Sequence, residues 1–117
     1  MPKLIEIPSF SDERGTLSVI EKVLPFSINR VYYIYNVNDH PRAGHRHHTG
    51  EQALICLHGC SNVHVKTESG HQDFELSSPH QCLLLDAKDW HSIQFKVGSI
   101  LLVLASHHYS PENYIND

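Results

Sequence analysis

Apolar and polar residues alternate along most of the chain with the two-residue period of β-strands. In NVHVKT, for example, Val63 and Val65 alternate with His64 and Lys66. Two runs, QCLLLD and ILLVLAS, are apolar almost throughout, as is typical of buried strands, and helical periodicity is nearly absent. Strands are predicted in GTLSVIEK (15–22), RVYYIYNV (30–37), QALICLHG (52–59), NVHVKT (62–67), FEL (74–76), QCLLLD (81–86), HSIQFKV (91–97) and ILLVLAS (100–106).

Turn-forming Gly, Pro, Asn and Asp residues separate these stretches. Short strands repeating every 8–12 residues or so are typical of an antiparallel sandwich or a small barrel. KLIEIPSF (3–10) has the character of an edge strand that can pair with a second subunit, which favours a homodimer. SPENYIND (110–117) forms one helical turn at most. The sequence therefore predicts one all-β domain over residues 1–117.

Composition and charge exclude several classes of partner. The net charge is -4 and no basic stripe runs along the chain, so a nucleic acid partner is not expected. No apolar run approaches the roughly 18 residues of a membrane span, and the N-terminus lacks the apolar region of a signal peptide. The three cysteines, Cys56, Cys60 and Cys82, are an odd count that fits free thiols in a reducing cytoplasm.

Histidines, 11 of the 117 residues, are densest in PRAGHRHHTGEQ (41–52). If this stretch is extended, His45 and His47 share one face, roughly 6.6 Å apart along the strand, while Arg46 and His48 occupy the other. In a small barrel one of these faces is the interior. Imidazoles buried there without partners are unfavourable, so the pair should have partners or a ligand.

The spacing His45-x-His47-x3-Glu51 resembles the first half of the cupin signature, and His91 lies about where its second half is expected. Four nitrogen and oxygen ligands of this kind suit iron, manganese, zinc or nickel. The same side chains without a metal would be proton-transfer groups, because neutral imidazole has a pKa near 6.5. The residues alone leave both interpretations open.

Further stretches, in the same order as in one family and covering nearly the whole chain, are DERGTLSVIE (12–21), INRVYYIYNV (28–37), PRAGHRHHTGEQALICLHG (41–59), DWHSIQF (89–95) and LLVLASHHYSPENYI (101–115). With these motifs the chain resembles the nucleotide-sugar 3,4-ketoisomerases, WxcM-like members of the cupin superfamily. One departure is ASHHY at 105–109, where members commonly have ASDYY.

The resemblance implies a jelly-roll-like β-barrel and a dimer with strands exchanged between subunits. It also implies conversion of a dTDP-4-keto-6-deoxyglucose to a dTDP-3-keto-6-deoxyhexose through an enediol, on the route to 3-amino sugars, without metal or cofactor. His45 and His47 would be the catalytic proton-transfer residues. Whether the product has the gluco or the galacto configuration stays open.

Five further residues are expected to bind the substrate. Arginine's planar fork suits the phosphate oxygens of the nucleotide, and a tyrosine hydroxyl can bond a phosphate or sugar oxygen. The residues are Arg14, Tyr33, Arg42, Glu51 and His91.

Two other functions compete with this interpretation. One is a metal-dependent cupin, either a dioxygenase or a metal isomerase, which would hold a transition metal at the histidines. The other is a cupin that binds a nucleotide sugar without catalysis, as a sensor or assembly module.

Overall fold

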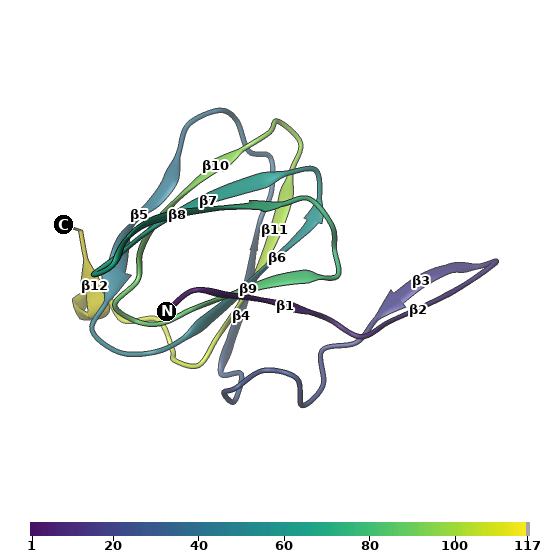
Figure 1. Ribbon diagram of the computed structural model, residues 1–117, viewed down its shortest axis with the longest axis horizontal. Coiled ribbons are helices and arrows are strands. Elements are labelled where there is room, and N and C mark those ends of the chain that lie inside the picture. Colours follow the sequence, from purple (N-terminus) through teal and green to yellow (C-terminus); the bar gives the residue numbers. More distant parts are fainter. Residues whose placement is uncertain (117) are drawn as a thin grey trace.

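The computed structural model describes residues 1–116 and consists of two facing antiparallel sheets and a projecting hairpin (Figure 1). The first sheet has the order β1 (Lys3–Glu6), β9 (Gln81–Leu85), β6 (Gln52–His58), β11 (Ile100–Ala105) and β4 (Arg30–Ile34). The second has the order β12 (Tyr114–Ile115), β5 (Arg42–His47), β10 (Trp90–Phe95), β7 (Ser61–Thr67) and β8 (Gly70–Leu76). The hairpin joins β2 (Ser9–Asp12) to β3 (Gly15–Ser18).

The all-β, jelly-roll-like prediction is confirmed. The sheets remain separate hydrogen-bonded units, so the barrel is open along its sides. Helical structure in residues 1–116 is limited to the 3-10 turn Pro111–Asn113, which agrees with the single turn expected in the tail. β1 lies at a sheet edge, as predicted. No helix within the described part of the chain is long and apolar enough to cross a membrane.

The main core lies between the two sheets, because alternate residues of each strand point into that space. The strands β6, β9 and β11 are apolar on both faces, because their outer face is covered as well. Segment 20–26 packs on the outer face of the first sheet and forms a second cluster there, with Ile55 and Leu104. The main core consists of Leu54, Cys56, Val63, Val65, Leu76, Leu83, Leu85, Ile93, Phe95, Leu101 and Val103.

The β2–β3 hairpin, called the arm below, extends away from the two sheets (Figure 1). Phe10 and Leu17 face each other across its two strands, and each is 64% exposed. The predicted strand GTLSVIEK therefore ends early, at Ser18, and its partner is the neighbouring strand β2 and not a strand of either sheet.

Candidate active site

The histidine-rich stretch forms β5, whose inner face carries His45 and His47 side by side. Their rings lie edge to face with centroids 4.9 Å apart, as the extended geometry predicts. Just before them, Ala43 and Gly44 have positive φ angles of 66° and 77°, at a shift in the pairing of β5 with β10. Such a bulge re-aims the residues that follow it. Here it places His45 opposite His91.

A cavity of about 320 Å³ opens between the sheets beside these histidines. His45 and His91 lie on its wall, whereas His47 lies behind the wall and is only 2% exposed. The other lining residues are Arg30, Tyr32, Tyr33, Ile34, Arg42, Ala43, Gln52, Leu54, Ile93, Val103 and Tyr114.

The surroundings of His47 keep its ring neutral. Burial is the main cause, and the charges of His45, His91, His107 and Arg30 add to it, so the pKa of His47 falls to about 3. Burial also lowers the pKa of His45. A neutral imidazole can accept a proton, which a charged one cannot, and the lowered pKa values favour the prompt return of that proton.

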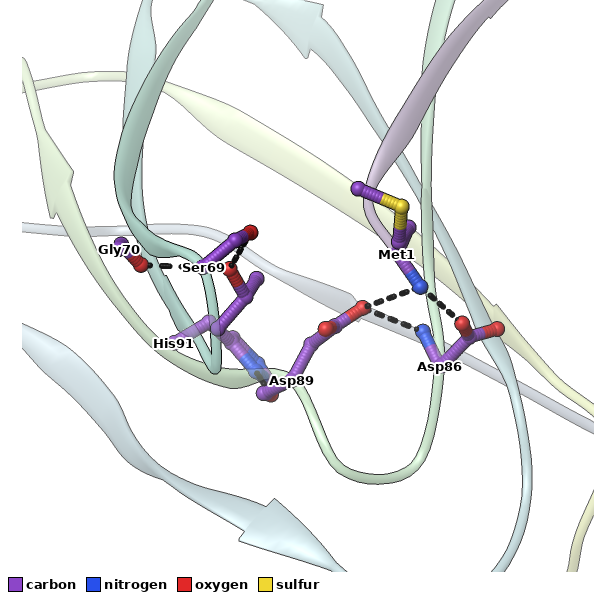
Figure 2. A network of polar contacts seen from close by, with 7 residues as sticks. Met1, Ser69, Gly70, Asp86, Asp89 and His91 are labelled. Carbon is purple, nitrogen blue, oxygen red and sulfur yellow. Dashed lines mark hydrogen bonds and ion pairs between the residues drawn. The ribbon is translucent and has the colours of Figure 1, made fainter.

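His91 is held by the turn that precedes β10 (Figure 2). Its Nδ1–H donates to the Asp89 carbonyl oxygen at 3.3 Å, which leaves Nε2 of the neutral ring as an acceptor. Burial lowers the pKa of His91 to about 4 despite this bond. The turn is fixed because the Asp89 carboxylate accepts from the Asp86 backbone N–H at 2.9 Å and lies 3.7 Å from the Met1 ammonium.

Two arginines line the cavity, Arg42 from β5 and Arg30 from β4. Arg42 was expected from the sequence, whereas Arg30 was not. The Arg30 guanidinium lies 4.4 Å from the centre of the Tyr32 ring and donates to the Tyr114 hydroxyl at 3.5 Å. Its position is therefore set by aromatic rings from two distant parts of the chain.

Tyr114 also closes over the histidines, since β12 pairs with β5 and brings Tyr114 opposite His47. Its ring centroid is 4.7 Å from those of both His45 and His47. Tyr32 likewise reaches the cavity, where burial raises the pKa of its hydroxyl and the Gln52 side-chain amide donates to that hydroxyl at 3.3 Å. Sequence reasoning missed both tyrosines.

Three residues expected to bind substrate are not beside the histidines. Arg14 lies on the arm, where it pairs with Asp12 at 2.5 Å. Tyr33 lines the cavity, but it is 64% exposed and its ring stacks on Tyr35, and no contact joins it to the histidines among the ring contacts of the described residues. Glu51 lines a different hollow, with Val23, Leu24 and Phe26 on the outer side of the first sheet.

The position of Glu51 bears on the metal hypothesis. The cupin-like ligand set needs Glu51 beside the histidines, and the structure does not bring them together. Within residues 1–116, no group of three or more His, Cys, Asp or Glu side chains is arranged to hold a metal ion. The residues as placed therefore do not fit the metal site of the rival hypothesis.

Comparison with known proteins identifies relatives over the full length. A family described as FdtA: WxcM-like, C-terminal matches residues 1–117. The chain is 38% identical to the TDP-4-oxo-6-deoxy-alpha-D-glucose-3,4-oxoisomerase of Aneurinibacillus thermoaerophilus, over 97% of this chain and 84% of that protein.

Solved structures agree with this match. A 3,4-ketoisomerase from Helicobacter canadensis superposes with a TM-score of 0.95 at 34% identity, over 99% of this chain and 90% of that one. A histidine-to-asparagine mutant of the 3,4-ketoisomerase QdtA from Thermoanaerobacterium thermosaccharolyticum, in complex with TDP-4-keto-6-deoxyglucose, superposes with a TM-score of 0.94. The sequence identity is 36%, over 99% of this chain and 87% of that chain.

The lowered pKa values of His47, about 3, and His91, about 4, make stability depend on pH. Between these values and the unfolded value near 6.5, the unfolded chain binds more protons than the folded one. The contribution of these two histidines to the free energy of unfolding is therefore fully present above about pH 6.5. It is lost as the pH falls toward 4. We expect His47→Asn to weaken this loss, measured as the change in thermal midpoint between about pH 7 and pH 4.

His108→Asn is the matched control, because His108 is exposed and its replacement should leave the pH dependence of the midpoint unchanged. Equal pH dependence in His47→Asn and the parent would contradict the assignment of a neutral, buried His47.

Proposed function

The chain belongs to the FdtA family (WxcM-like, C-terminal), and from this membership we propose that it is a TDP-sugar 3,4-ketoisomerase that converts TDP-4-keto-6-deoxyglucose to a TDP-3-keto-6-deoxyhexose. The observation that carries the proposal is the pair of neutral imidazoles, His45 and His47, in contact beside a cavity that also holds two arginines. Substrate and product are isomers, so no redox cofactor is consumed.

The reaction moves two protons in four transfer steps, so that one passes from C3 to C4 and one from O3 to O4. The C4 carbonyl acidifies the C3 proton, and His45 removes it because His45 lies on the cavity wall. Protonation of O4 gives an enediol intermediate, which becomes the 3-keto form when O3 loses its proton and His45 returns a proton to C4. His47, which contacts the His45 ring from behind the cavity wall, is assigned to the protons of the two oxygens, which reach it through a water molecule because its ring does not line the cavity.

The arginines are assigned to the diphosphate. Arg30 and Arg42 both line the cavity, and guanidinium groups bind phosphate oxygens through paired hydrogen bonds. His91 offers Nε2 as an acceptor for a sugar hydroxyl. Tyr114 covers the sugar side of the cavity through its contacts with both catalytic histidines.

A homodimer gives the arm a role. In one chain the arm exposes Phe10 and Leu17, and Arg14 lies away from the cavity. A second copy can cover the apolar pair, as the strand exchange implied by the family resemblance requires. We place Arg14 of each chain at the substrate of the other, which accounts for an arginine that the single chain leaves remote.

Loss of His45 and loss of His47 should have different effects when TDP-4-keto-6-deoxyglucose is followed by NMR in heavy water. His45→Asn should abolish both product formation and deuterium uptake at C3, because the carbon base is gone. His47→Asn should lower product formation more than uptake, because the enolate still forms and returns. Each positioned proton transfer contributes roughly 10²–10⁴-fold to the rate.

Parental turnover in both variants would show that the pair is structural. Activity that disappears on chelation and returns with added metal would favour the metal-dependent cupin instead. Binding of the nucleotide sugar by the parent without deuterium uptake at C3 or C4 would favour a non-catalytic module.

Replacing Arg30 or Arg42 with alanine should raise KM roughly tenfold or more and change kcat less, because phosphate contacts form in both ground and transition states. Charge-assisted hydrogen bonds of this kind contribute about 1.5–3 kcal/mol each. Lys96→Ala is the control, since Lys96 is an exposed cation outside the cavity lining. Unchanged KM in both arginine variants would place the diphosphate elsewhere.

Mixed dimers test the arm directly. Light scattering should report a dimer of two 13.3 kDa chains. Arg14→Ala and His45→Asn chains should each be weakly active or inactive alone. When they are mixed, unfolded and refolded together, some dimers combine an intact His45 with an intact Arg14 from the other chain, so activity should return. A monomer, or mixtures without any gain in activity, would contradict the exchange.

A further inference from the structure

His107, which the mechanism above does not use, lies in a slot next to His47. It follows β11 by two residues, and its ring centroid is 5.3 Å from that of His47. Gly50, with a φ of +101°, forms one side of the slot. A Cβ atom at Gly50 would lie 2.1 Å from His107 Nδ1, so the slot admits the imidazole only because residue 50 has no side chain.

Three ring nitrogens in this region are buried and unpaired. Neither Nδ1 nor Nε2 of His107 has a hydrogen-bond partner among the described residues, and the same holds for Nε2 of His47. Buried polar groups are nearly always hydrogen-bonded, and leaving them unpaired is unfavourable. The burial of the polar His107 ring without a partner destabilises the fold, which points to a role for this ring in the chemistry of His47.

We propose that His107 extends the proton relay: it takes a proton from His47 during the reaction and returns it, directly or through one water molecule. The inference rests on the proposed ketoisomerase function. The step is balanced, because one N–H bond breaks on His47 as one forms on His107, and the reverse transfer restores both rings. His107 acts through His47 and does not touch the sugar, so it is a positioning residue of the relay.

The charges around His107 suit a temporary carrier. Burial lowers its pKa first, and the charge of Arg30 lowers it further, so the resting ring is neutral and can accept a proton. The same positive charge disfavours a long-lived imidazolium at His107. The ring also faces His47, which is itself neutral at rest. A proton passed to His107 is therefore returned readily.

Rescue with small rings separates a relay from simple packing. His107→Ala should lower kcat about tenfold or more with little change in KM, because His107 does not line the cavity. Added imidazole should restore much of the lost kcat by occupying the emptied slot. Pyrazole has nearly the same size and shape but is far less basic, so it should restore little. His108→Ala, a change at the neighbouring exposed histidine, should retain parental turnover.

Equal rescue by imidazole and pyrazole, or parental kcat in His107→Ala, would overturn the relay and leave a packing role. If His107→Ala fails to fold by circular dichroism, His107→Gln replaces it. Glutamine keeps a polar side chain but cannot carry a proton near neutral pH, so its kcat should fall equally, and parental turnover would overturn the proposal. A parental protein that forms no 3-keto product overturns the ketoisomerase function and the relay with it. Loss in the His107 variants alone leaves the ketoisomerase function intact.

Discussion

The removal of His47 from water is the constraint on which the site depends. A 2% exposed imidazole surrounded by other imidazoles and an arginine is neutral at neutral pH, so it is free to accept a proton and disposed to release it again. This burial depends on three paired strands of the second sheet. β5 supplies the ring itself, β10 places His91 beside it, and β12 lays Tyr114 across it. The histidines are therefore buried and neutral because of how these strands pair, and a histidine-rich loop on the surface would not acquire the same properties.

The sequence predicted the features that follow from local periodicity. Alternation located the strands, and the edge position of β1 and the short turn in the tail were also foreseen. The shared face of His45 and His47 follows from the two-residue repeat within one strand. Such inferences succeed because both residues belong to one element, so no knowledge of partner strands is needed.

Features that depend on register between strands could not be predicted. Glu51 directly follows Gly50, just before β6. Neighbouring residues of a strand point to opposite faces, so a shift of one residue in the start of β6 would exchange its two faces. In the structure Gln52 reaches the cavity, and Glu51 lies on the other side of the sheet. The same parity separates Tyr32 from Tyr33 in β4. Tyr114 is 67 residues or more from β5 in sequence, because β5 ends at His47, and only the pairing of β12 with β5 shows that it covers the histidines. Long-range pairing leaves no local pattern from which such contacts could be inferred.

The size of the cavity supports the proposal that two chains act together. A volume of about 320 Å³ is at the lower end of ligand pockets, which span about 300–1,000 Å³, and it suits a sugar ring better than a whole nucleotide sugar. In the proposed reaction the sugar lies at the imidazoles, which are the assigned proton-transfer groups. In the same proposal the nucleotide extends past Arg30 and Arg42 toward solvent, where one chain would offer it little cover. The arm, by contrast, exposes apolar side chains to solvent, since Phe10 and Leu17 are both largely uncovered in the single chain. The proposed exchange of arms between two chains would resolve both difficulties at once: it would bury the apolar pair and enclose the end of the substrate that the cavity leaves outside.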